Sequence, residues 1–336
     1  MGLKEIGEFG FIKRISRGCL VRPEGVIKGI GDDAAAFRTD SRLAALLTTD
    51  LLVERVHFLR EAISAYELGH KSLAVNLSDI AAMGGTAREA FVSIAIPEGY
   101  ELDALEDLFQ GMKDLAARYA VNILGGDTTR SRTDLIISVA VYGQVPEDEM
   151  LTRGAARPGD VLFTTGCLGD SRAGLHLILN QIPIDTPELK SLLAAHLHPE
   201  PHLREGRLLA SSGGVRAAID VSDGLSSDLG HILEESRVGA RIQAEKLPIS
   251  ENLRSYCRRF GKSPVDYALA GGEDYVLLLT ASAERFGEVA RGFQGTFGRP
   301  LYAIGEITDS LTMELLGPGA TLTPIVPSGW DHFKGP

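Results

Sequence analysis

A chain of 336 residues is long enough for two domains, and its 44% hydrophobic and 24% charged residues are the composition of a globular protein. The formal net charge of −11 argues against binding of nucleic acid or anionic lipid through bulk positive charge, and three cysteines without a CxxC pair exclude a disulfide or zinc scaffold. Apolar runs are all shorter than the roughly 18 residues of a membrane span, and no signal-peptide pattern is present. We therefore expect a cytoplasmic protein that binds neither nucleic acid nor membranes.

Strand and helix patterns alternate through the first half of the chain. Ser64 and Glu67 form a capping-box pattern before an amphipathic helix that ends near Met83, and apolar residues at helical spacing predict a helix over 102–119. Buried strands are predicted over 43–49, 91–96, 121–124 and 135–145. The first half thus has an α+β pattern with about four strands.

Turn-forming residues and charges cluster over 146–158, where we place the boundary between domain 1–148 and domain 149–336. The second half is again α+β. Its predicted helices lie near 170–180, 188–197 and 202–211, and its predicted strands lie over 161–165, 216–221, 239–244, 275–280 and 301–307. The segment 317–333 is rich in Gly and Pro, so we expect an extended tail on the surface.

Aspartates recur beside glycines and after apolar runs. They are Asp32, Asp33, Asp50, Asp79, Asp127, Asp220 and Asp223. Any one of them could be a turn former or a helix N-cap, but as a set they would repel one another by about 1 kcal/mol per close pair even in water. Oxygen ligands without nearby Cys or His favour Mg²⁺ or Mn²⁺ over zinc, and Mg²⁺ completes its shell with waters and phosphates. The pattern predicts a divalent-metal site that holds a nucleoside triphosphate.

Two further groups of polar residues can each be interpreted in two ways. Ser72, Asn76 and Asp79 share one face of the helix that ends near Met83, and this face could be a buried polar strip or simply a solvent-exposed face. His57 could belong to the same site as Asp50 or be a structural histidine. The histidines of HLHPEPH are expected in a solvated loop, because the prolines break helical spacing; they are His196, His198 and His202.

Glycine-rich segments and one arginine are the remaining candidates for phosphate contacts. The stretches 125–129 and 166–171 let backbone approach a phosphate or are plain turns. Arg153 is either a phosphate clamp or an exposed linker residue. The common nucleotide-binding loop patterns are missing from the sequence.

Eight motifs, taken together, resemble one enzyme family in their order and spacing. They are GIGDDAA (29–35), TTDLLVERVHF (48–58), KSLAVNLSDIAAMGG (71–85), GGDTTRS (125–131), LTRGAARPGD (151–160), DVSDGLSSDLGHI (220–232), AGGEDY (270–275) and WDHF (330–333). With them the chain resembles, over nearly its whole length, the thiamine-monophosphate kinases of the aminoimidazole ribonucleotide synthetase-like superfamily. The reactive cysteine expected of selenophosphate synthetases is missing.

The resemblance implies a two-domain α+β fold of the aminoimidazole ribonucleotide synthetase type. Its N-terminal α/β domain would dimerise through its sheet and bind ATP and several Mg²⁺ ions, and the tail of its C-terminal α+β domain would return to the acceptor site. By motif, the metal ligands are Asp33, Thr48, Thr49, Asp50, Asp79, Asp127, Asp220 and Asp223. The nucleotide contacts are Gly126, Asp127, Arg153 and Ser222, and the thiamine phosphate pocket contains His57, Glu273 and Trp330. The family often has Tyr or Phe in place of Trp330 and commonly Arg in place of His202.

The implied reaction is ATP-dependent phosphorylation of thiamine monophosphate to thiamine diphosphate, by direct in-line transfer in a homodimer. Because the attacking phosphate oxygen is already anionic, cations that screen two anions matter more than a general base. The expected catalytic residues are Asp33, Asp50, Asp127, Asp223 and Arg153. Two alternatives are another ATP-using synthetase of the superfamily and a non-catalytic scaffold that binds metal and nucleotide. Trp330 could instead cover an apolar patch.

Overall fold

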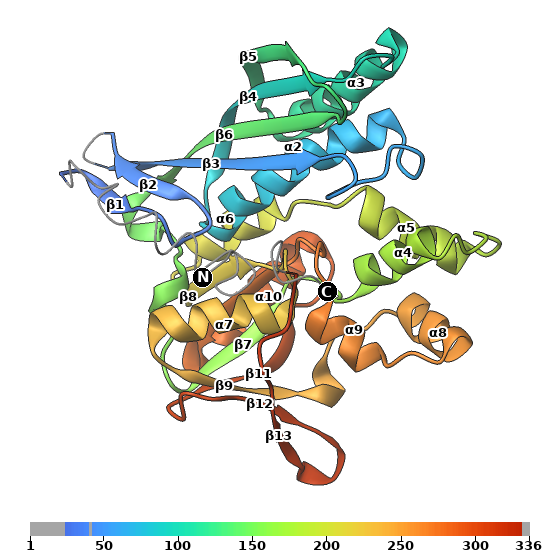
Figure 1. Cartoon of the computed structure of the whole chain (residues 1–336). Helices are drawn as coiled ribbons and strands as arrows, with labels where there is room; N and C mark the ends of the chain where they lie inside the picture. Colours follow the sequence, from blue (N-terminus) through green and yellow to red (C-terminus); the bar gives the residue numbers. More distant parts are fainter. Residues whose placement is uncertain (1–23, 40–41, 331–336) are drawn as a thin grey trace, which may run out of the picture.

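The computed structural model describes residues 24–39 and 42–330, which form two β-sheets with helices packed around them (Figure 1). The first sheet contains, in spatial order, β1 (Val26–Lys28), β2 (Ala35–Arg38), β3 (Leu43–Val53), β6 (Ile136–Pro146), β4 (Thr86–Ile96) and β5 (Asn122–Arg130). The second contains β13 (Leu322–Pro324), β12 (Met313–Leu316), β9 (Gly239–Gln243), β11 (Tyr302–Thr308), β7 (Asp160–Thr164), β10 (Leu277–Ser282) and β8 (Val215–Asp220). The α+β class with two sheets is confirmed.

The first sheet has one face turned to the core and one face turned outward. Strand β3 pairs antiparallel with β6 along its whole length, so alternate side chains point to opposite faces. Leu46 and Leu52 are buried, whereas Leu47 and Leu51 are exposed, as is Phe91 on β4. We call the side that carries Leu47, Leu51 and Phe91 the outer face of the first sheet.

Helix α2 (Ala65–Ala82) lies between the two halves of the chain. Its predicted capping box is confirmed: Ser64 Oγ accepts the Glu67 N–H at 3.2 Å, and the Glu67 carboxylate accepts the Ser64 N–H at 3.1 Å. The helix packs on β3 and β6, along α3 (Leu102–Tyr119), and against β8 and α6 (Leu203–Ser211) of the second half. A Cβ on Gly69 would lie 1.8 Å from the Leu108 carbonyl oxygen, so this approach of α2 to α3 requires glycine.

The second half follows β6 through two short 3₁₀ turns, Glu147–Glu149 and Arg153–Ala155. Besides α6, its helices are α4 (Asp170–Leu179), α5 (Pro187–Leu197), α7 (Leu225–Ser236), α8 (Glu251–Phe260), α9 (Pro264–Ala270) and α10 (Ala283–Phe297), with further 3₁₀ turns at Ala244–Lys246 and Pro318–Ala320. The apolar core is continuous between the halves, because Leu77 of α2 belongs to the same buried cluster as Phe163 of β7 and Leu279 of β10.

Several elements differ from the sequence predictions. The strand predicted over 43–49 continues to Val53, and β1 and β2 were not predicted because three or four residues are too few to show a period. The expected extended surface tail is confirmed over 322–330, where the exposed strand β13 also pairs antiparallel with β12, with Leu316 opposite Leu322. Among the described residues, no helix is both long enough and apolar enough to cross a membrane.

Candidate active site

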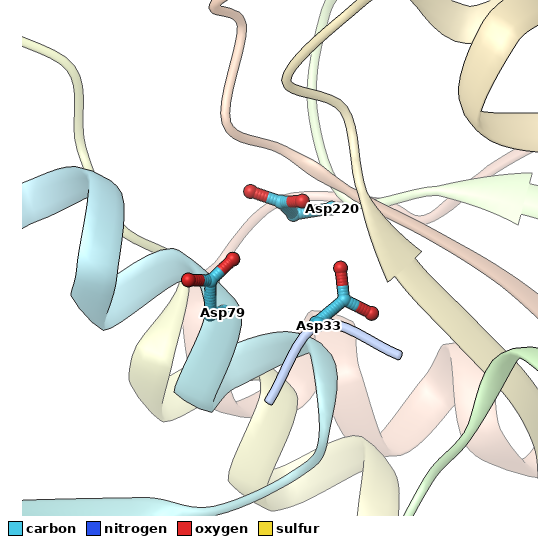
Figure 2. Close-up of side chains that lie close together, drawn as sticks. All are labelled: Asp33, Asp79 and Asp220. Carbon is cyan, nitrogen blue, oxygen red and sulfur yellow. The ribbon is translucent and has the colours of Figure 1, made fainter. Parts of the chain in front are cut away.

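Three aspartates from distant parts of the sequence meet between the two sheets. Asp33 lies in the turn between β1 and β2, Asp79 in the last turn of α2, and Asp220 at the end of β8. One carboxylate oxygen of each lies within 4.8 Å of the others, and Figure 2 shows the three side chains around a common space. They form a compact group of oxygen ligands with no histidine or cysteine among them.

Burial makes the ionised form of these carboxylates costly. It raises the pKa of Asp79 well above its usual value, and the charges of Asp50, Asp220 and Asp33 raise it further. Burial, followed by the charge of Asp33, raises the pKa of Asp220 to about 8. The hydroxyls of Thr48 and Ser78 donate to Asp79 and Asp220, at 2.5 and 2.6 Å. Such a group fits a divalent cation, which would replace protons as the counter-charge.

Strand β3 contributes Asp50 to the same region. Its backbone N–H donates to Asn76 Oδ1 of α2 at 3.1 Å, and burial raises the pKa of its carboxyl to about 6. Asn76 and Ser72 are buried, so the interpretation of their helix face as solvent-exposed is wrong. Thr48 points to the buried side with Asp50, whereas Thr49 alternates with them and lies on the outer face of the first sheet.

Arg153 lies beside the carboxylate cluster. Its Nη2 and Nε donate to the two oxygens of Asp33 at 2.9 and 3.3 Å, and only 14% of its side chain is exposed. The interpretation of Arg153 as an exposed linker residue is therefore wrong. Burial would lower the pKa of Arg153, but the charges of Asp33 and Asp32 raise it, so the guanidinium stays charged. The neighbouring Asp32 pairs with Lys28 at 2.9 Å.

The loop after β8 carries Ser222 and Asp223 and receives the tail of the chain. Asp228, in the first turn of α7, accepts the backbone N–H groups of Asp223 and Gly224 at 3.2 and 3.0 Å and so fixes this loop. The backbone N–H of Trp330 donates to the Asp223 carbonyl oxygen at 3.2 Å. The tail thus passes directly over the loop that follows Asp220, whereas positions 331–333 of the terminal motif lie outside the described residues.

Glu273 lies in a constrained loop next to Ser222. Its backbone N–H donates to the Ser222 carbonyl oxygen at 2.7 Å, and both Glu273 and Tyr275 have left-handed backbone, with φ of 61° and 50°. Burial would raise the pKa of Glu273, but the charges of Lys71, His196 and His57 hold it below its usual value. His57 and Glu273, both expected at the acceptor, therefore lie near each other.

Gly126 and Asp127 lie apart from the cluster. A Cβ on Gly126, whose φ is +149°, would lie 1.7 Å from the Val92 carbonyl oxygen, so only glycine fits there. Asp127 is exposed and lines a cavity of about 120 Å³ with Ser93 of β4 and Ser138 of β6. Ser138 alternates with the buried residues of β6, so this cavity opens on the outer face of the first sheet, where Thr49 also lies.

Two backbone donors of the segment 166–171 are already engaged by a side chain. The Asp274 carboxylate accepts the N–H groups of Gly169 and Ser171 at 2.7 and 3.3 Å, at the start of α4. Burial raises the pKa of Asp274 to about 8. An internal carboxylate thus accepts the N–H groups of Gly169 and Ser171 at the start of this helix.

The expected solvated histidine loop is wrong for His196 and His202, whereas His198 is exposed. His196 and His202 are buried, and the ring of His198 stacks on His70 of α2 with centroids 3.4 Å apart. The rings of His196 and His202 instead lie within hydrogen-bond distance of the hydroxyls of Ser171 and Thr165, at 3.1 and 2.5 Å. The sequence pattern missed these contacts because the partners are distant in the sequence. It also missed Lys71, a fully buried lysine of α2 that pairs with Glu273 at 2.8 Å.

Comparison with known proteins gives a consistent result. The models of AIR synthase related protein, N-terminal and C-terminal domain, match residues 31–145 and 157–316. The thiamine-monophosphate kinase of Aquifex aeolicus is 37% identical over 99% of this chain and 100% of its own length, and that of Escherichia coli K12 is 36% identical over 98% and 99%. The solved structure of AaThiL complexed with AMPPCP and TMP superposes with a TM-score of 0.87, at 36% identity over 99% of both chains. The chain therefore belongs to the thiamine-monophosphate kinase family of AIR synthase related proteins.

Proposed function

We propose that the protein transfers the γ-phosphoryl group of ATP to thiamine monophosphate and so forms thiamine diphosphate. The observation that carries the proposal is the buried cluster of Asp33, Asp79 and Asp220 beside the acceptor candidates Glu273 and Trp330. Family membership adds that a structure 36% identical to this chain is complexed with AMPPCP and TMP.

The reaction needs charge screening more than proton transfer. The attacking oxygen of a phosphate monoester is anionic at neutral pH, so two anions must be brought together in line. Bound at Asp33, Asp79 and Asp220, with Asp50 and Asp223 nearby, Mg²⁺ would neutralise charge on the ATP phosphates. Arg153 is already ion-paired with Asp33. Its role in the proposal is to fix that carboxylate and to add a positive charge to the site.

The acceptor side suits a cationic ring. The thiazolium of thiamine carries a positive charge, which Glu273 complements and which an aromatic face such as Trp330 attracts by about 0.5–2 kcal/mol. His57 lies near Glu273 on the loop that follows β3. The tail that carries Trp330 reaches the site through its hydrogen bond to Asp223.

The test measures ADP formation in the presence of Mg²⁺ and ATP, with and without thiamine monophosphate. We expect ADP only when the acceptor is present, an equivalent amount of thiamine diphosphate, and loss of turnover in Asp79→Asn. Asp107→Asn, which neutralises an exposed aspartate on α3, is the matched control and should retain full activity. ADP formation that is independent of the acceptor, or wild-type turnover in Asp79→Asn, would contradict the proposal.

We also propose that the protein is a homodimer joined through the outer face of the first sheet. This face exposes 44%, 51% and 43% of Leu47, Leu51 and Phe91, which are apolar side chains of β3 and β4 on the two sides of β6. Thr49 and Asp127 share this face, so a metal bound by them would lie near the interface. Sedimentation at micromolar concentration should give twice the chain mass, and Phe91→Arg should give the monomer; a wild-type monomer would rule out this interface.

A further inference from the structure

The buried lysine of α2 connects the two sides of the site. Lys71 is 1% exposed, and its ammonium donates to the His196 carbonyl oxygen at 3.1 Å and pairs with Glu273 Oε1 at 2.8 Å. A buried, unpaired ammonium is strongly unfavourable, so this lysine is held in place by its partners and in turn holds them.

Both oxygens of the Glu273 carboxylate have partners. Oε1 faces Lys71, and Oε2 lies 3.1 Å from His196 Nδ1. The side chain nevertheless remains 28% exposed, so one edge of the carboxylate stays open to a ligand. The orientation of that edge is therefore set from behind, by a residue of α2 and a residue of α5.

The backbone of Glu273 does not fix the side chain by itself. Its left-handed φ of 61° is an uncommon conformation for glutamate and is held by the hydrogen bond from its N–H to Ser222. Lys71 approaches from the other half of the molecule, on the helix that also carries Asp79. Lys71 and Asp79 are eight positions apart, which corresponds to about 12 Å along a helix axis, so one helix carries both the metal cluster and the lysine.

We propose that Lys71 is a positioning residue for the acceptor: it holds the Glu273 carboxylate, across the junction of the two halves, in the orientation that meets the cationic ring of thiamine monophosphate. This inference rests on the proposed function. Lys71 itself does not touch the acceptor, because its ammonium is enclosed by Glu273 and the His196 carbonyl.

The first test is Lys71→Met, which keeps the length of the side chain and removes its charge. We expect the KM for thiamine monophosphate to rise about tenfold or more, because a charge-assisted contact that orients the carboxylate is lost. The KM for ATP and the stabilisation by Mg²⁺ should stay unchanged. Ser72→Ala is the matched control: Ser72 is also buried on α2, but its hydroxyl donates to the Leu68 carbonyl oxygen and not to the site.

The second test is the double-mutant cycle with Glu273→Gln. If Lys71 acts through Glu273, the variant that carries both changes has the same KM for the acceptor as Glu273→Gln alone. Additive increases, or an equal loss for both substrates in Lys71→Met, would overturn the proposal, because Lys71 would then act separately or only stabilise the fold.

Two further outcomes keep the test decisive. If Lys71→Met does not fold, Lys71→Gln takes its place, since its amide can still donate to the His196 carbonyl oxygen without a charge. If Glu273→Gln leaves the KM for thiamine monophosphate unchanged, the positioning role is refuted. Acceptor-dependent ADP formation by the wild type would show in that case that the proposed reaction stands on its own.

Discussion

Neutralising Asp220 should change how the stability of the metal-free protein depends on pH. Burial raises the pKa of this carboxyl from 3.8 to about 8 in the folded chain, so the folded state binds a proton more tightly than the unfolded state. The stabilisation from this proton is complete below pH 3.8 and is lost as the pH rises through 8. Metal-free wild-type protein should therefore become less stable between pH 7 and pH 9.

The size of the effect follows from the same shift. A group with a folded pKa of about 8 loses about 1.4 kcal/mol of stabilisation between pH 7 and pH 9, the equivalent of one pKa unit. For a chain of this length that is on the order of 2 °C in Tm. The buried histidines do not interfere in this range, because burial lowers the pKa of His70 and His196 to about 4 and both are neutral above pH 7.

The assay is thermal unfolding in EDTA at pH 7, 8 and 9. Between pH 7 and pH 9 the free energy of unfolding of Asp220→Asn should fall by about 1.4 kcal/mol less than that of the wild type, whereas Asp107→Asn should show the wild-type fall. Added Mg²⁺ should stabilise the wild type more at pH 9 than at pH 7, because the metal and the proton compete for the same oxygens. Equal slopes in wild type and Asp220→Asn would refute the proton linkage at this cluster.

Three other substitutions have defined consequences. Trp330→Ala should raise the KM for thiamine monophosphate about tenfold and leave that for ATP unchanged, and the fluorescence of this single tryptophan should respond to the acceptor; a flat titration would remove Trp330 from the pocket. Gly206→Ala should lower the free energy of unfolding by a few kcal/mol, because its Cβ would lie 2.2 Å from the Ala81 carbonyl oxygen, and an unchanged urea midpoint would contradict this packing. Ser64→Ala should cost about 1 kcal/mol through loss of the capping box, and a shift no larger than that of an exposed control such as Asp107→Asn would show that the cap is not needed.

Local patterns predicted some helices well, although α7, α8, α9 and α10 were not predicted. The helix over 102–119 and the capping box at Ser64 depend on residues that are neighbours in the sequence, and the structure confirms both. The aspartates could be predicted as a group because each stands in a characteristic motif. That Asp33, Asp79 and Asp220 meet, however, depends on how the two halves pack, which no local pattern contains.

Long-range partners explain what the sequence did not show. Lys71 looks like an ordinary lysine in an Ala- and Leu-rich helix until Glu273 and His196 are brought to it from the other half. The histidines beside Pro199 and Pro201 look solvated, but His196 and His202 are buried by residues that lie elsewhere in the sequence. By contrast, side chains alternate between the two faces of a strand, so Thr49 must lie on the opposite face from Thr48 and Asp50. That the expected ligands are divided between two faces of the sheet could therefore have been predicted from the sequence.

The burial of α2 between the two halves has a consequence for biosynthesis. While the chain emerges from the ribosome, residues 65–82 are complete long before β8 at 215–220 exists to cover their second side. Until β8 is synthesised, the side of α2 that β8 covers stays exposed to solvent, and an exposed apolar surface promotes aggregation or chaperone binding. Folding of this site should be completed only after the carboxyl-terminal half has been synthesised.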